Sequence, residues 1–166
     1  MRIIDSILAE LDREGETTRR VLERVPTDKL SWKPHPKSMS LGQLVQHIAT
    51  TPVQVAQLSA ESPRELPNFG EQPAAASTSE ALKALDDCLA ATRTMLSGLD
   101  DQALMTPWRL TKGGVTIMEI PRIGVLRSIM LNHWYHHRGQ LSVYLRELDV
   151  PLPSIYGPSA DENPFA

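Results

Sequence analysis

A clear helical period runs through residues 123–148, and it constrains the fold more than any other feature of the chain. The apolar residues recur at steps that fit one face of a helix, in a stripe roughly 60° wide. These residues are Ile123, Leu126, Met130, Leu141, Tyr144 and Leu148. His133 and His137 fall inside the same stripe, where the period requires apolar side chains. Two inward-facing histidines one turn apart need a cause.

Two explanations account for histidines in these positions. Side chains at i and i+4 have Cβ atoms about 5–6 Å apart on one helix face. Two imidazoles can therefore bind one metal ion, each nitrogen about 2.0–2.1 Å from it. Alternatively, both are core histidines whose ring nitrogens are hydrogen-bonded to buried partners. His136 lies about 100° from His137 on the same helix, so we expect it to face solvent or a partner and not to bind the metal.

A third ligand has to come from elsewhere in the chain. His35 lies in Lys-Pro-His-Pro, a rigid extended segment that indicates a surface loop. His47 lies in a second amphipathic segment, about 60° from Leu44 and at the edge of its apolar stripe. That stripe comprises Leu41, Leu44, Ile48 and Val55. A histidine at the edge of one stripe can meet two in the middle of another, so we predict a metal site formed by His47, His133 and His137.

Two short motifs identify a known family. Asn-His-Trp-Tyr-His-His-Arg-Gly-Gln-Leu occupies positions 132–141, and Leu-Val-Gln-His-Ile-Ala occupies positions 44–49, about 85 residues earlier. The chain closes with Pro-Leu-Pro-Ser-Ile-Tyr-Gly-Pro-Ser-Ala-Asp-Glu at 151–162, followed by four more residues. Together these segments make the sequence resemble the DinB-like family over nearly its whole length.

The resemblance implies an all-α fold, a four-helix bundle that forms one domain over residues 1–166. It also implies a divalent metal ion held by one histidine on the second helix and an H-x-x-x-H pair on the last. Those positions match His47, His133 and His137. Known members range from thiol transferases and isomerases to proteins of unknown role, and they are often homodimers. We therefore expect a homodimer, which a bundle can form through an exposed helix face.

Length, charge and cysteine content indicate which kinds of protein and partner are compatible with the sequence. The 166 residues, 41% of them hydrophobic, are enough to bury one core. The net charge of −3 comes without a run of like charges, which argues against nucleic-acid and anionic-membrane partners, because phosphate binding needs a clustered basic surface. Cys88 is the only cysteine, which indicates a reducing compartment. No segment has the apolar length of a signal peptide or a membrane span, so we expect a cytoplasmic protein.

Local signals delimit the first two helices. The first is predicted over residues 3–25 and is ended by a proline, after which a proline-rich connector follows. The second is predicted from a capping box, in which Ser40 and Gln43 exchange hydrogen bonds, to about residue 60. Pro52 interrupts its pattern, so we expect a kink there.

The second half of the chain contains a loop, two helices and a short hairpin. Residues 61–77 are predicted to form a long loop that acts as a lid or a wall of the pocket. A second capping box opens a helix over residues 77–98. The β-type runs 108–111 and 115–118 flank Lys-Gly-Gly and predict a short hairpin before the last helix. Pro121 suits the first turn of that helix.

Three histidine ligands leave a coordination position open for water or substrate. Their neutral imidazoles leave a divalent ion its full charge, so that it can lower the pKa of bound water or stabilise a thiolate. Ligand softness favours Zn²⁺ first, with Ni²⁺ or Fe²⁺ as alternatives. A zinc-protease motif is excluded, because it requires glutamate after the first histidine and here Trp134 follows His133.

Three functions remain open at this point. The preferred hypothesis is a metal-dependent transferase or isomerase that activates a small-molecule thiol toward an electrophile, as some of the proteins it resembles do. The second is a hydrolase that uses metal-bound water, although no carboxylate base is evident one helical turn from the three histidines. The third is a non-catalytic bundle that only binds a metal.

Overall fold

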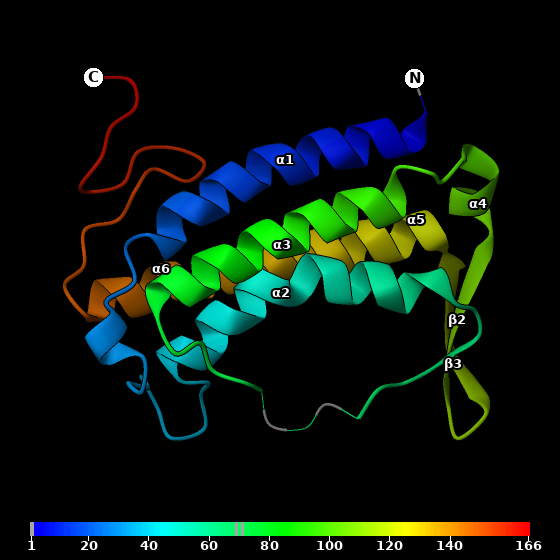
Figure 1. The fold of residues 1–166 in the computed structure, drawn as a ribbon, viewed down its shortest axis with the longest axis horizontal. Helices are drawn as coiled ribbons and strands as arrows, with labels where there is room; N and C mark the ends of the chain where they lie inside the picture. The colour runs from blue at the N-terminus through cyan, green and yellow to red at the C-terminus, as the bar shows by residue number, and fades with distance from the viewer. Residues whose placement is uncertain (1, 69, 71) are drawn as a thin grey trace.

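Four long helices run side by side in the computed structural model, which describes residues 2–68, 70 and 72–166. The first three are α1 (Ile3–Leu22), α2 (Leu41–Ala60) and α3 (Thr78–Leu96). The fourth is continuous through α5 (Arg122–Gly124), η2 (Val125–Leu131) and α6 (Asn132–Glu147). Two short helices, η1 (Thr27–Lys29) and α4 (Asp101–Met105), lie in the connections. The predicted four-helix bundle is confirmed (Figure 1).

Capping residues begin α2 and α3 as predicted. In α2, Gln43 N–H donates to Ser40 Oγ over 3.1 Å, and Ser40 N–H donates to Gln43 Oε1 over 2.8 Å. In α3, Glu80 N–H donates to Ser77 Oγ over 3.1 Å. The return bond differs from the predicted capping box, because Glu80 Oε2 accepts from Ala76 N–H, one residue earlier. Such caps satisfy N–H groups that have no partner inside the helix.

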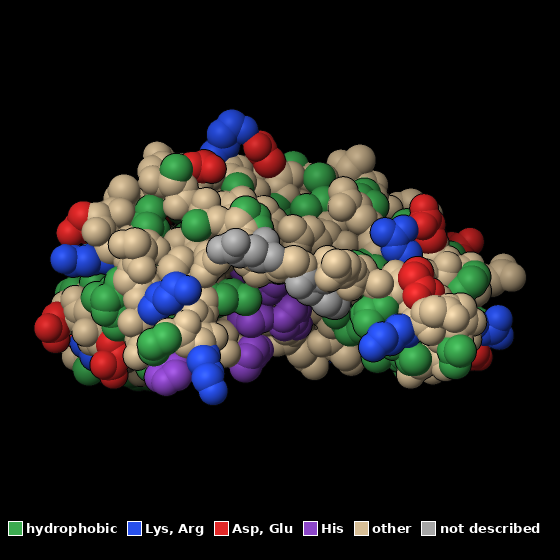
Figure 2. All heavy atoms as spheres, turned by 90° about the horizontal axis from the view of Figure 1, so that it is seen from below, with side chains coloured by type: hydrophobic (Ala, Val, Ile, Leu, Met, Phe, Trp, Pro, Cys, Tyr) green, Lys and Arg blue, Asp and Glu red, His purple; other side chains and the backbone are tan. Residues whose placement is uncertain are grey.

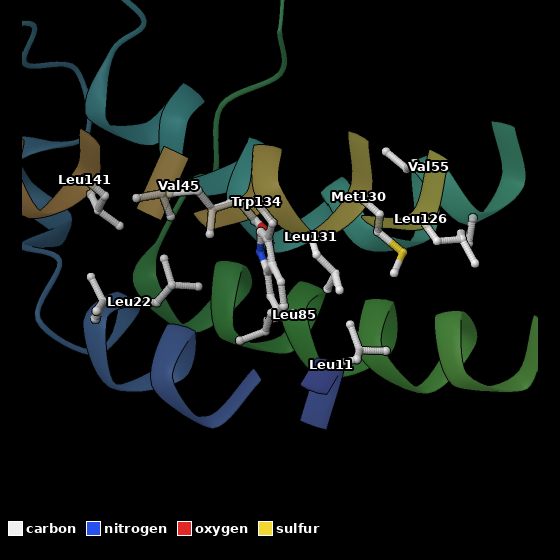
Figure 3. Packing of buried hydrophobic residues seen from close by; sticks show 14 of the residues in the cluster. Leu11, Leu22, Val45, Val55, Leu85, Leu126, Met130, Leu131, Trp134 and Leu141 are labelled. Atoms are coloured by element: carbon white, nitrogen blue, oxygen red, sulfur yellow. The ribbon is translucent and has the colours of Figure 1, made fainter. Parts of the chain in front are cut away.

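The core lies between the four helices and is mainly aliphatic. Figure 3 shows part of it, with Trp134 of the last helix extending toward Leu85 of α3. Gly15 of α1 has a packing role here, since a Cβ at this position would lie 2.8 Å from Leu89 Cδ1. The glycine therefore lets α1 and α3 approach closely, which offsets its low helix propensity.

The predicted hairpin is present at one end of the bundle. It consists of β2 (Pro107–Lys112) and β3 (Val115–Pro121), paired antiparallel. Gly113 and Gly114 connect them with φ of 58° and 78°, the left-handed conformations that a tight two-residue turn requires. A third strand, β1 (Arg64–Glu65), pairs in parallel with β2 and was not predicted. This pairing joins one end of the α2–α3 loop to the hairpin.

The buried face of the last helix differs from the one predicted from the sequence. Its buried face in α6 is formed by Trp134, Arg138, Leu141 and Leu145. His133 and His137 are half-buried beside this face, and not in its middle as the regular period predicted. At about 100° per residue, these four buried positions centre on a direction roughly 90° from the two histidines, so the predicted stripe was placed too close to them.

The C-terminal segment packs back across the bundle. Arg20 of α1 donates to Ser154 O over 3.3 Å and pairs with Glu162. Tyr156 contacts Arg138 of α6 and donates to Glu14 of α1 over 2.9 Å. Among residues 2–68, 70 and 72–166, no helix is long and apolar enough to cross a membrane.

Candidate metal centre

The fold brings together the three histidines that the sequence singled out. Their nearest ring nitrogens lie within 4.8 Å of one another, although His47 is on α2 and the other two are on α6. The ring centroids of His133 and His137 are 4.4 Å apart, and those of His47 lie 5.2 Å and 4.5 Å from them. The three rings stand edge-on to one another.

Hydrogen bonding fixes the ring orientation of the α6 pair. His137 Nδ1 lies 2.7 Å from Gln140 Oε1, and because an amide oxygen only accepts, Nδ1 carries the proton. The Nε2 atom of His137 then carries a lone pair, which accepts from His133 Nε2–H over 2.6 Å and which a metal ion would use in place of that bond. A hydrogen bond on one ring nitrogen that directs the other is common in histidine metal ligands. Gln140, which sequence reasoning missed, is identifiable from its i+3 spacing to His137.

His47 provides the observation that best fits a bound cation. Both of its ring nitrogens are buried, and neither makes a well-formed hydrogen bond to a described residue; the Gln72 side chain is the polar neighbour near enough to raise the pKa of the ring slightly against the larger effect of burial. A buried polar group without a partner is costly, and a metal ion removes that cost at one nitrogen. The alternative of hydrogen-bonded histidines was predicted for His133 and His137, and that pair does have hydrogen-bond partners in each other and in Gln140. It does not account for His47.

Burial keeps the cluster in the protonation state that metal ligands need. It lowers the pKa of His137 to about 4 and holds the pKa values of His47 and His133 below the usual range. Proximity of the rings acts in the same direction, because one imidazolium disfavours another. The three imidazoles are consequently neutral near pH 7, and the cluster could hold a divalent metal ion.

The two remaining histidines lie outside the cluster. His136 is exposed, as its position on the helix predicted. His35 is exposed in the α1–α2 connection, where its Nδ1 accepts from Lys37 N–H over 3.2 Å.

A pocket of about 410 Å³ opens beside the cluster, and His47 and His133 form part of its wall. Figure 2, which views the molecule from below, shows histidine side chains gathered in a hollow near the centre of the surface. The pocket lies between α2, the α2–α3 loop and η2, so the predicted role of that loop as a wall is confirmed. Its other lining side chains include Thr51, Gln54, Val55, Leu58, Pro67, Asn68, Gln72, Pro73 and Ile129. Among the described lining residues there is no aspartate or glutamate.

A buried ion pair supports α6 on the side away from the pocket. The Arg138 side chain is 1% exposed, and its guanidinium lies 2.5 Å from the Glu14 carboxylate and donates to Thr18 Oγ1 over 3.1 Å. It also lies 5.2 Å and 5.1 Å from the ring centroids of Tyr135 and Tyr156. Arg138 directly follows His137, but its role could not be predicted from the sequence.

These observations define a class: a four-helix bundle with a three-histidine cluster at the edge of a pocket. Comparison with known families agrees, because the model of the DinB superfamily matches residues 10–141. The chain therefore belongs to the DinB superfamily. A stretch of 39 residues is also 41% identical to the uncharacterized protein YrdA of Bacillus subtilis strain 168. That match covers 24% of this chain and 23% of YrdA.

Solved structures of similar fold cover nearly the whole chain. A DinB-like protein from Bacillus cereus has a TM-score of 0.71 at 23% identity, covering 92% of this chain and 97% of that one. The DinB-like protein YjoA of Bacillus subtilis has a TM-score of 0.69 at 23% identity, covering 90% and 96%. A conserved protein from Enterococcus faecalis has a TM-score of 0.64 at 18% identity, covering 89% and 97%. These similarities establish the fold.

Proposed function

We propose that this protein is a metal-dependent transferase or isomerase that activates a small-molecule thiol at the cluster of His47, His133 and His137. The observation that carries the proposal is the convergence of the three histidines, whose ligand atoms lie within 4.8 Å of one another, with the buried ring nitrogens of His47 lacking a well-formed hydrogen bond to a described residue. Three neutral histidines leave a coordination position open. A divalent ion held there stabilises a thiolate relative to the thiol.

The pocket supports thiol chemistry over hydrolysis. Metal-bound water as a nucleophile works best with a nearby base, and the described lining offers no carboxylate for that role. A thiol that ionises at the metal centre does not need such a base. The apolar wall formed by Val55, Leu58 and Ile129 suits an electrophile with an apolar body, because small-molecule pockets are mainly apolar with a few polar groups.

Zn²⁺ is the proposed ion, with Ni²⁺ and Fe²⁺ as alternatives. Imidazole nitrogen suits all three of these ions. Zn²⁺ ranks first because it binds readily to three protein ligands plus one exchangeable position.

Thiol binding is tested by the thermal midpoint of metal-loaded protein in the presence of low-molecular-weight thiols. A thiol at about 100 times its dissociation constant stabilises the native state by roughly 2.7 kcal/mol. For a chain of this length, that corresponds to a rise of roughly 5–10 °C. The same thiols should leave the midpoint of metal-stripped protein and of His133→Ala unchanged. A metal-loaded protein that gives no shift with any thiol would favour the hydrolase or the non-catalytic bundle.

The proposed assembly is a homodimer, and the proposed domain spans residues 1–166. Exposed apolar side chains at the hairpin end support self-association, namely those of Met105, Val115, Ile117 and Met118. Light scattering at micromolar concentration should give twice the 18.4 kDa of one chain. A mass of one chain would contradict the dimer. We also propose a cytoplasmic location and small-molecule partners, without nucleic acid or membrane.

A further inference from the structure

Pro52 leaves a backbone carbonyl of α2 without its usual partner. Proline has no N–H, so it cannot donate to the carbonyl of Ile48, four residues earlier. Ile48 and Pro52 are both buried, so water cannot easily replace the missing bond. A buried carbonyl without a hydrogen bond destabilises a fold, so the location of a replacement donor is informative.

The replacement donor comes from the other helix of the metal centre. Trp134 Nε1–H donates to Ile48 O over 2.8 Å, and the indole is fully buried. Figure 3 shows this side chain among the core residues, between the ribbons of α6 and α3. Indole nitrogen is a donor only, so an acceptor freed by proline satisfies it completely.

The positions of these residues connect the bond to the site. Ile48 directly follows His47, and Trp134 directly follows His133. The bond therefore joins α2 to α6 one residue away from a candidate ligand on each helix.

Two further contacts hold the α2 turn in place. Thr51 Oγ1 donates to His47 O over 2.6 Å, within the turn that precedes the proline. Val53 N–H donates to Cys88 Sγ of α3 over 3.3 Å. The turn is thus attached to α6 by Trp134 and to α3 by Cys88. This leaves little freedom for the backbone that carries His47.

We propose that Trp134 is a positioning residue for the metal centre, acting through its hydrogen bond to the carbonyl of Ile48. The inference rests on the proposed metal-dependent function. Through this bond, Trp134 sets the distance between His47 and the two α6 histidines. A purely structural role would make the bond important for stability alone.

Two substitutions separate these roles. Trp134→Phe keeps an aromatic ring in the core but removes the donor, so Ile48 O loses its partner. Pro52→Ala introduces an N–H that can donate to the same carbonyl within α2. The double variant thus satisfies the carbonyl again, yet it has no bond between the helices. The measurements are the thermal midpoint of metal-free protein, Zn²⁺ affinity by chelator competition, and NMR contacts between the ring protons of His47 and His137.

Trp134→Phe is expected to lower both the midpoint and the Zn²⁺ affinity, the latter by roughly tenfold or more, as changes in groups that support metal ligands do. Pro52→Ala alone should bind Zn²⁺ as the unchanged protein does, because Trp134 can still donate to the second lone pair of Ile48 O. In the double variant the midpoint should recover relative to Trp134→Phe. Its affinity should stay low and its ring contacts should remain weakened.

Recovery of Zn²⁺ affinity together with the midpoint in the double variant would overturn the positioning role. So would unchanged affinity in Trp134→Phe. Failure of the proposed function gives a different result, in which the unchanged protein binds no Zn²⁺. The NMR contacts between the histidine rings remain informative in that case. If they are present in the unchanged protein and in Pro52→Ala but weakened in Trp134→Phe and in the double variant, they still support the role of Trp134.

Discussion

Replacing His47 with alanine is expected to lower Zn²⁺ affinity by roughly 100-fold or more, whereas replacing His136 should change it little. Loss of a direct ligand must exceed the roughly 10–100-fold effect of losing a group that only supports one. His47 is also the only candidate ligand contributed by α2 among the described residues, so without it the α6 pair binds the ion alone. Chelator competition measures the affinities, and circular dichroism verifies that both variants are folded.

His133→Ala serves as the positive control for ligand loss, and His35→Ala as a second negative control. His35 is exposed and its Nδ1 accepts a backbone hydrogen bond, so its replacement should leave Zn²⁺ binding intact. Equal affinities for His47→Ala and His136→Ala would show that the α2 ligand is wrong. The centre would then have to include another residue, and a fall in affinity for His35→Ala would identify it.

Features determined by neighbouring residues could be predicted from the sequence. The cap at Ser40 depends on a side chain and an amide three residues apart, and the structure contains both of its hydrogen bonds. The turn at Gly113 and Gly114 depends on two residues that tolerate positive φ. Even the gathering of His47 with His133 and His137 follows from two helical periods, once the two helices are taken to pack together.

Features determined by distant contacts could not be predicted in the same way. The two-residue strand β1 exists only because β2 lies beside it, since so short a segment has no periodicity of its own. Pro52 predicted a disturbance in α2, but the sequence does not show that Trp134 satisfies the freed carbonyl 86 positions away. The π-helix before His133 was missed because a fixed step of about 100° per residue assumes an α-helix throughout.

The misassigned helix face also concealed Arg138. In a regular helix its position lies off the predicted apolar stripe, where an arginine reaches solvent and needs no partner. In the structure it lies on the buried face with Trp134 and Leu141, and the Glu14 carboxylate lies 2.5 Å away with only 12% of that side chain exposed. Charged residues are rarely fully buried unless they are paired.

Replacing Arg138 with methionine should therefore destabilise the protein strongly. Removing one partner of a buried pair leaves the other charge uncompensated, which costs about 3–5 kcal/mol. Because the Glu14 side chain retains some exposure, we expect the lower end, about 3 kcal/mol of unfolding free energy. For a chain of this length that corresponds to a fall in thermal midpoint of roughly 6–12 °C. Denaturant or thermal unfolding of metal-free protein measures the effect without a contribution from the site.

The matched control is Arg93→Met, which breaks an ion pair with Asp12 in which the side chains are 49% and 54% exposed. Exposed pairs contribute about 0–1 kcal/mol, so this variant should unfold close to the unchanged protein. Adding Glu14→Gln to Arg138→Met should recover part of the loss, because the carboxylate left behind no longer carries a charge. Equal destabilisation by the Arg138 and Arg93 variants would mean that solvent screens Glu14. The buried pair would then not be what fixes α6 against α1, and the packing of Tyr135 and Tyr156 around the guanidinium would have to do so.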